Sequence, residues 1–503
     1  MQNVETDNIS RQLRRHDLIV IGSGGGLVTL DRALAAGYDC ALIEKGRFGG
    51  TCLTRGCIPT KILATAATLA MEVRQADRIG VETEGVNLNW QTLSRRVQAA
   101  VNQRFQVEDH YRSQPNCHVY TGSAAFTADG DIEVSYGDGR APDILRSDRI
   151  VIATGGHTRI DPLPGLTDDM YLTSETLFAE KWPRTPPDRL LILGGGPVGV
   201  EFAHIFHEAG TRVTLAQRNV RLLPQAEPEI SGQLLAALRE RGIVVHTDTV
   251  CDEVMRAANG EILCRLRERT SGRLTTVATD QILLATGIVP HTELQPERAG
   301  IQVDERGWIQ TNEYLETSRP GVWAIGDVNG RYSFRHVVNQ EAICLADNLF
   351  PETRAVGGAD NGRRPMRYDA VPQVTFSAPE VAHAGLTAQA AQAAGHLIRV
   401  ARRRFSQSAK GQALGHPAGT AEDGLVLLII DAGEAPGRLL GAHIIGPEAA
   451  LLLQPLLLLL GAPHADSRDC DHVARMNAIM TPHPALSEAV FWAVSELGGP
   501  QDD

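Results

Sequence analysis

The chain has 503 residues, 43% of them hydrophobic, and a formal net charge of −12 at pH 7. This length predicts about three domains, and the acidic balance without a basic block argues against nucleic acid or an acidic membrane as a partner. Residues 1–15 lack the apolar segment of a secretory signal, and the longest apolar run, 449–462, is too short to span a bilayer. With only eight cysteines in this length, we expect a cytoplasmic protein that has no membrane partner.

The first recognisable unit is a strand, a glycine-rich turn and a helix over residues 17–36, followed by a second strand that ends at Glu44. Such a βαβ unit can hold a dinucleotide, because the glycines leave room for a pyrophosphate at the helix N-terminus and the acid accepts from a ribose hydroxyl. The candidate turn residues are Gly22, Gly24 and Gly26. Leu27 replaces the third glycine of the fingerprint, so either the helix packs less closely on the strand or Gly26 takes over.

A pair of cysteines, Cys52 and Cys57, comes next, just before a predicted helix. Pro59 suits the first position of that helix, and the helix dipole favours a thiolate at Cys57. The pair could be redox-active, a structural disulfide or half of a zinc site. Because zinc needs four ligands and no second cysteine pair with ligand spacing follows, we favour a redox pair and expect no bound metal.

A second glycine-rich unit covers residues 190–217 and matches the fingerprint in full at Gly194, Gly196 and Gly199. Two fingerprints in one chain predict two bound dinucleotides. The last strand of this unit ends at Gln217, where a carboxylate would hold the 2′-hydroxyl of NAD. Arg218 and Arg221 follow, and guanidinium groups suit a 2′-phosphate. We therefore expect NADPH rather than NADH, unless both arginines are ordinary surface residues.

Together these motifs resemble the FAD-dependent pyridine nucleotide–disulfide oxidoreductases, the family of lipoamide dehydrogenase, glutathione reductase, mycothione reductase and mercuric reductase. The resemblance extends from about residue 16 to residue 492. It implies an α/β protein with two Rossmann-like dinucleotide-binding domains, for FAD and NAD(P), and a C-terminal α+β dimerisation domain. The matching segments are the cysteine run at 49–61, the strand ends at 153–155 and 285–287, the second FAD motif at 324–327, the entry to the dimerisation domain at 372–380, and the His–Glu segment at 483–488.

The resemblance also implies a division of the chain. Residues 14–158 would form the first part of the FAD-binding domain, 159–288 an inserted NAD(P)-binding domain, 289–365 the return to the FAD-binding domain, and 366–503 the dimerisation domain. Glycine-containing loops mark the last boundary, at Gly357, Gly358 and Gly362.

Catalytic roles follow from the same resemblance. Cys57 would be the sulfur nearer the flavin, and Cys52 the thiol that attacks the substrate disulfide. His483, supplied by the partner subunit of a homodimer, would move the proton, and Glu488 would orient its imidazole. On its own a histidine followed by a glutamate is a common pattern, so the roles of this pair depend on the family context.

The resemblance assigns the remaining site residues to the cofactors. Lys61 and Glu201 would form an ion pair near the flavin and nicotinamide rings, although each could be an ordinary surface charge. Asp327 would bind the ribityl chain, or alternatively cap a turn. The full set of candidate cofactor-binding residues is Gly22, Gly24, Gly26, Glu44, Lys45, Gly50, Thr51, Lys61, Ala124, Thr154, Gly155, Asp327, Gly194, Gly196, Gly199, Arg218, Arg221 and Gly287.

The implied activity is transfer of two electrons from NAD(P)H through FAD and the cysteine pair to a small disulfide. The stretch 56–61 and the substitution at Leu27 look most like mycothione reductase and its lipoamide-dehydrogenase-like neighbours. Gln217 replaces the acid that lipoamide dehydrogenases normally carry. Dihydrolipoamide dehydrogenase activity on lipoamide or a lipoyl protein is the alternative. A non-catalytic flavoprotein subunit is a remote one, since all four redox residues are present. Cys470 is interpreted as an inert thiol, and the other cysteines as packing residues: Cys40, Cys117, Cys251, Cys264 and Cys344.

Overall fold

The computed structural model describes residues 13–353, 362–461 and 471–498, which form two compact units. The first unit combines the segment up to Thr60 with residues 96–158 and 288–367. The second combines residues 61–95 and 159–287 with the segment from Tyr368 onward. The loop at Gly357–Gly358 and Cys470, both singled out in the sequence, lie outside the described residues.

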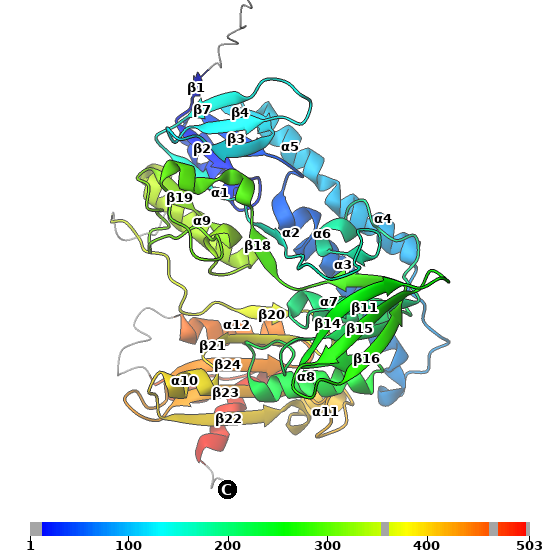
Figure 1. Ribbon diagram of the computed structural model, residues 1–503. Coiled ribbons are helices and arrows are strands. Elements are labelled where there is room, and N and C mark those ends of the chain that lie inside the picture. Colours follow the sequence, from blue (N-terminus) through cyan, green and yellow to red (C-terminus); the bar gives the residue numbers. More distant parts are fainter. Residues whose placement is uncertain (1–12, 354–361, 462–470, 499–503) are drawn as a thin grey trace, which may run out of the picture. The chain divides into compact units, whose positions relative to one another are not determined.

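A five-stranded parallel sheet forms the centre of the first unit (Figure 1). In spatial order its strands are β19 (Val322–Ala324), β8 (Ile150–Ile152), β2 (Leu18–Ile21), β3 (Cys40–Glu44) and β4 (Cys117–Thr121). Helix α1 (Gly26–Ala35) joins β2 to β3 and packs against α9 (Arg335–Leu349). All of β2 is buried, as expected for the central strand of a parallel sheet.

The first unit also contains a smaller sheet, a ribbon and short helices. The sheet has the order β1 (Leu13–Arg15), β7 (Asp143–Arg146), β6 (Ile132–Ser135) and β5 (Ser123–Phe126). Strands β9 (Gly156–Thr158) and β18 (Ile288–Pro290) pair as an antiparallel ribbon where the chain leaves and re-enters this unit. The helices that matter for the site are α2 (Gly50–Thr54), α3 (Cys57–Arg74), whose later part belongs to the second unit, and α5 (Gln103–Ser113).

The second unit contains another five-stranded parallel sheet. Its order is β10 (Tyr171–Leu172), β17 (Gln281–Leu284), β11 (Arg189–Leu193), β12 (Arg212–Ala216) and β13 (Val244–His246). Helix α7 (Pro197–Glu208) joins β11 to β12 and repeats the connection that α1 makes in the first unit. An antiparallel sheet of β14 (Thr249–Arg256), β15 (Ile262–Glu268) and β16 (Leu274–Thr279) accompanies it, and α8 (Pro228–Glu240) precedes β13.

The C-terminal part of the second unit is an antiparallel sheet with helices, drawn in yellow to red in Figure 1. The sheet has the order β20 (Gln373–Thr375), β21 (Val381–Gly385), β24 (Leu439–Ile445), β23 (Leu425–Asp431) and β22 (Ile398–Arg404). Helix α12 (Ala449–Leu460) packs against β21 and β24, and α13 (His472–Ala478) and α14 (Ser487–Trp492) follow. Among the described residues, no helix is both long and apolar enough to cross a membrane.

This architecture is the predicted fold class, two Rossmann-like sheets and a C-terminal α+β part, but the helix expected after the cysteines begins earlier than predicted. Cys52 lies inside a short helix of its own, α2. Helix α3 begins at Cys57, so Pro59 is its third residue rather than its first. Pro59 is still within the first turn, where a missing N–H costs no helical hydrogen bond.

Candidate functional site

The two glycine-rich turns have the same backbone geometry. Gly22 follows β2 with a φ of +104°, and Gly194 follows β11 with a φ of +117°. A side chain at Gly22 would collide with the carbonyl oxygen of Ala153, and one at Gly194 with that of Ala285. Because L-residues rarely adopt such φ values and no space exists for a Cβ, both positions require glycine. The Ala-Thr-Gly segments identified in the sequence therefore lie directly against the two turns.

Gly26 takes over the role of the missing third glycine in the first turn. A Cβ on Gly26 would lie 2.7 Å from Val20 Cγ1 and 3.0 Å from the Cβ of Ala153. In the second turn, a Cβ on Gly199 would lie 1.8 Å from the carbonyl oxygen of Gly194 and 3.4 Å from Cγ2 of Ile192, which occupies the same place in its strand as Val20. Each helix therefore packs closely at a glycine, and this favours Gly26 over looser packing as the answer to the substitution at Leu27.

Glu44 and Gln217 occupy equivalent positions beside the two turns. Glu44 Oε2 accepts a hydrogen bond from the backbone N–H of Ser23 at 2.9 Å, and Gln217 Oε1 accepts one from the N–H of Gly195 at 3.1 Å. The second turn is thus built like the first, but its acceptor carries no charge. Gln217 is buried and its amide also donates to the backbone carbonyl of Arg221, at 3.3 Å.

The start of α2 meets the first turn backbone to backbone. The hydroxyl of Ser23 donates to Glu44 Oε2 at 2.6 Å and accepts from the N–H of Gly49 at 3.1 Å. A Cβ on Gly50 would lie 2.6 Å from Gly24 Cα, so the first turn leaves no room for a side chain at Gly50. Sequence reasoning missed Ser23, because nothing in a glycine-rich run distinguishes its one hydroxyl from a spacer residue.

Two buried polar groups of the first unit fit a bound dinucleotide. The Thr154 Oγ1 atom is buried and has no hydrogen-bond partner within the described part of the chain. Asp327 lies in the short turn 326–329, where burial and then the neighbouring charge of Glu341 raise its pKa to about 6. A cofactor hydroxyl would supply Thr154 Oγ1 with the partner it lacks, since a buried polar group without a partner is costly. A second cofactor hydroxyl would suit the carboxyl of Asp327.

The two cysteines lie at helical positions in the first unit. Cys52 is half-buried within α2, and Cys57 is exposed as the first residue of α3. A helix N-terminus stabilises a thiolate, because the unpaired N–H groups and the aligned peptide dipoles present positive charge there. The geometry therefore favours Cys57 as the sulfur that carries the charge in the reduced pair.

Lys61 and Glu201 form the ion pair expected from the resemblance, within the second unit. Lys61 Nζ is 2.5 Å from Glu201 Oε2, and the side chain of Glu201 is 9% exposed. Glu201 Oε1 also accepts from the N–H of Phe376 at 2.9 Å, while Lys61 Nζ is 4.4 Å from the centre of the Phe376 ring. In the sequence of α3, Lys61 follows Cys57 by four residues, which is about one helical turn.

His483 and Glu488 are joined at the C-terminal end of the second unit. His483 Nδ1 is 2.7 Å from Glu488 Oε1, and Glu488 Oε2 accepts from the N–H of Ala485 at 3.2 Å. The hydrogen bond with His483 lowers the pKa of the buried Glu488 carboxyl. The imidazole itself is 67% exposed, so Nε2 is the ring nitrogen that can exchange a proton with a reactant.

The other candidate residues lie at the positions their motifs predict, with varied surroundings. Lys45 pairs with Glu293 and lies 3.1 Å from His291 Nδ1. Arg218 is exposed beyond the end of β12, whereas Arg221 is half-buried and its Nε has no hydrogen-bond partner in the described structure. The remaining ones are Thr51, exposed in α2; Ala124, buried in β5; Gly155 and Gly287, both at positive φ; and Gly196, the N-cap of α7.

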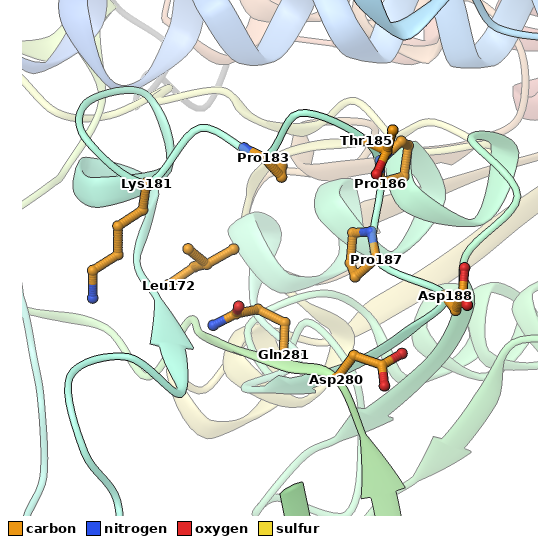
Figure 2. Close-up of a pocket in the computed structure, with 9 residues that line it drawn as sticks. All are labelled: Leu172, Lys181, Pro183, Thr185, Pro186, Pro187, Asp188, Asp280 and Gln281. Atoms are coloured by element: carbon orange, nitrogen blue, oxygen red, sulfur yellow. The ribbon is translucent and has the colours of Figure 1, made fainter. Parts of the chain in front are cut away.

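A separate cavity of about 260 Å³ lies in the second unit, at the amino ends of the strands of its parallel sheet. Figure 2 shows the residues that line it. Asp188 and Gln281, which line it, lie at the amino ends of β11 and β17, whereas Gly194 follows the carboxyl end of β11. Two of its charged side chains are already engaged: Asp280 pairs with Arg189, and Lys181 donates to backbone carbonyls. The cavity is therefore separate from the glycine turn at the carboxyl ends of the strands, where a dinucleotide is expected to bind.

Comparison with known proteins matches two family models to this chain. The model described as pyridine nucleotide-disulphide oxidoreductase matches residues 16–342, and the dimerisation domain of the same family matches residues 371–494. A dihydrolipoyl dehydrogenase of Bacillus subtilis is 32% identical over 499 residues, which cover 96% of this chain and 98% of that protein. A mycothione reductase of Mycobacterium tuberculosis is 33% identical over 471 residues, which cover 88% of this chain and 92% of that protein. A solved structure, the Cu(II) complex of the HOCl-induced flavoprotein disulfide reductase RclA from Escherichia coli, has a TM-score of 0.79 at 26% identity and covers 96% of this chain and 99% of its own.

Proposed function

The chain belongs to the pyridine nucleotide-disulphide oxidoreductase family, and from this premise we propose that it is an NADPH-dependent reductase of a low-molecular-weight disulfide. It is a flavoprotein disulfide oxidoreductase, and its family uses FAD and NAD(P)H. Bound FAD supplies two-electron transfer between the nicotinamide and a disulfide. The observation that carries the choice of NADPH and of reduction is the neutral Gln217 in the place that Glu44 occupies in the first turn.

In this proposal the cysteine pair performs the exchange with the substrate. His483 Nε2 first takes the proton of the Cys52 thiol. The Cys52 thiolate attacks one sulfur of the substrate disulfide, forms a mixed disulfide and expels the first substrate thiolate, to which His483 gives that proton. The Cys57 thiolate then attacks the sulfur of Cys52, the second substrate thiolate leaves and takes a proton from water, and the Cys52–Cys57 disulfide is restored. The hydrogen bond between His483 Nδ1 and Glu488 fixes the imidazole so that Nε2 is the nitrogen available for this transfer.

We propose that the chain acts as a homodimer, in which each copy supplies His483 to the cysteine pair of the other. The family match includes a dimerisation domain over residues 371–494. Large apolar side chains are exposed on and near this part: Leu451 and Leu458 on α12 are 68% and 77% exposed, and Met480, close to His483, is 96% exposed. Apolar surface of this kind next to a catalytic histidine supports an interface that brings the histidine to a partner.

The lowered pKa of Glu488 keeps its carboxylate available to His483 over a wide pH range. The hydrogen bond with His483 holds that pKa below the usual value, so Glu488 is an anion throughout the neutral range. Changing Glu488→Gln removes the charge that faces the imidazole, so kcat for disulfide reduction should fall at every pH from 5 to 9. Profiles of kcat for the two enzymes over this range measure the loss. An unchanged kcat in Glu488→Gln would show that Glu488 does not support the histidine.

Choice of NADPH depends on the two arginines after β12. Arg218→Ala should lower kcat/KM for NADPH by about tenfold and leave the value for NADH nearly unchanged, since only NADPH offers a 2′-phosphate. Arg212→Ala is the matched control, because Arg212 is exposed at the other end of the same strand. Equal effects of Arg218→Ala on both cofactors, or a wild-type preference for NADH, would overturn the assignment.

The first turn should be essential for holding FAD. Gly22→Ala is expected to give protein with little bound FAD, because a methyl group collides with the Ala153 carbonyl and forces the turn to move. Gly37→Ala is the control, since Gly37 also has a positive φ (+84°) but its Cβ would meet nothing within 4 Å. The ratio of flavin to protein absorbance measures the effect. Full FAD occupancy in Gly22→Ala would contradict the assignment of this turn.

A second candidate is dihydrolipoyl dehydrogenase activity. The Bacillus subtilis relative bears this name, and the match covers 98% of its length. The two activities run in opposite directions with different cofactors. We expect faster turnover with NADPH and small disulfides, including mycothione-like ones, than with NAD⁺ and dihydrolipoamide. Efficient reduction of NAD⁺ by dihydrolipoamide, with weak use of NADPH, would favour the second candidate.

A further inference from the structure

Three side chains with metal-ligating atoms meet at the amino ends of the strands in the first unit. His16 precedes β2, Asp39 precedes β3, and His118 is the second residue of β4. Their ligating atoms all lie within 4.8 Å of one another. Gly22 follows the carboxyl end of β2, whereas the cluster lies at the amino ends of the strands. The cluster is therefore separate from the glycine turn and from the proposed redox site.

The carboxylate of Asp39 lies between the two imidazoles. His16 Nδ1 is 2.6 Å from Asp39 Oδ2, and His118 Nε2 is 2.7 Å from Asp39 Oδ1. Each carboxylate oxygen of Asp39 therefore faces a nitrogen of a different ring.

His16 is already held in the orientation that a metal ligand needs. Its side chain is 5% exposed, and its second nitrogen, Nε2, is 3.1 Å from the hydroxyl of Tyr120. Metal-bound histidines almost always have their other ring nitrogen hydrogen-bonded in this way. Asp39 and His118 are 43% and 48% exposed, so water can reach the cluster from the solvent side.

We propose that His16, Asp39 and His118 bind one divalent transition-metal ion of the Zn²⁺ class, with water completing its coordination. Two imidazoles and a carboxylate suit Zn²⁺, Cu²⁺ or Ni²⁺, whereas Mg²⁺ and Ca²⁺ prefer oxygen ligands alone. Zinc lies about 2.0–2.2 Å from nitrogen and oxygen ligands, so the donors must separate slightly. The two exposed side chains can make that adjustment. The second ring nitrogen of His16, Nε2, keeps its hydrogen bond with the hydroxyl of Tyr120.

Such an ion would connect parts of the unit that are distant in sequence. His16 lies between β1, in the four-stranded sheet, and β2, in the five-stranded sheet. Asp39 and His118 belong to the ends of two further strands. The bound ion would therefore fix the passage between the two sheets, and its effect should appear as added thermal stability rather than as a change in the redox reaction.

The test is Zn²⁺ binding to the FAD-loaded full chain in its oxidised form, by equilibrium dialysis with metal analysis. We expect one Zn²⁺ per chain and a rise in Tm that 10-fold more Mg²⁺ does not reproduce. His118→Gln and Asp39→Asn, both at exposed positions, should weaken Zn²⁺ binding by at least about tenfold and abolish the rise in Tm. His110→Gln is the matched control, since His110 is exposed on α5 in the same unit.

Co²⁺ as a substitute probe distinguishes this cluster from the cysteines. Nitrogen and oxygen ligation gives Co²⁺ only weak visible bands, whereas thiolate ligation adds intense near-ultraviolet absorbance. We expect the weak bands alone, and their loss in His118→Gln. Zn²⁺ binding that His118→Gln leaves unchanged, Co²⁺ spectra that show thiolate ligation, or no Zn²⁺ binding at all would each overturn the proposal and leave Asp39 as a hydrogen-bonding bridge between two histidines.

Discussion

Cys52→Ser is expected to abolish disulfide reduction, lowering kcat by about three orders of magnitude or more, while the protein keeps its FAD. Without the Cys52 sulfur no disulfide can form, so Cys57 remains a thiol at the start of α3, where the helix dipole favours the thiolate. A thiolate beside the flavin should give the resting enzyme a standing long-wavelength absorbance band. Absorbance spectra and a steady-state assay with a small disulfide measure the two effects.

Two further variants make this result specific. Cys57→Ser should also lose turnover but show no band, because the sulfur proposed to lie next to the flavin is gone. Cys344→Ala changes a buried cysteine in α9 that has no proposed role, so turnover and spectrum should both remain. Turnover retained in Cys52→Ser, or a band seen in Cys57→Ser instead, would reverse or reject the roles of the two sulfurs.

His483→Ala should slow reoxidation by the disulfide substrate by about 10²–10³-fold, within the range that general acid–base catalysis contributes. The leaving thiolate then lacks its proton donor. Reduction of the enzyme by NADPH should proceed at the wild-type rate, because no step of that half-reaction involves His483 in this proposal. Rapid-mixing absorbance measurements separate the two half-reactions.

His396→Ala is the matched control for this change. His396 Nδ1 is 3.1 Å from Asp431 Oδ2, so it too is a histidine paired with a carboxylate in the C-terminal part of the second unit. Neither half-reaction should change in His396→Ala. A slower reaction with NADPH in His483→Ala, with normal reoxidation, would contradict the proton-transfer role.

Sequence reasoning predicted the features that depend on local pattern. Strand, glycine turn and helix follow one another along the chain, so both dinucleotide units could be recognised from spacing and residue type. The equivalence of Glu44 and Gln217 was also predictable, because both follow the last buried residues of their strands. The role of Gly26 could be given only as one of two possibilities, since it depends on how closely α1 approaches Val20 and Ala153.

Features that depend on distant residues could not be predicted. Ser23 joins the turn to both Glu44 and Gly49, but a single serine in a glycine-rich run gives no signal of it. Phe376 contacts the Lys61–Glu201 pair across more than 170 residues of chain. The cluster of His16, Asp39 and His118 arises only because three parallel strands bring their amino ends together, and no ligand spacing in the sequence indicates it.

Anaerobic titration of the purified protein with NADPH, followed by absorbance, tests the central claim most directly. The account predicts that about one equivalent of NADPH produces a long-wavelength band from the Cys57 thiolate beside the flavin, and that a small disulfide then abolishes the band. Flavin bleaching without such a band would mean that Cys52 and Cys57 do not exchange electrons with the flavin. Disulfide reduction through this cysteine pair would then be wrong.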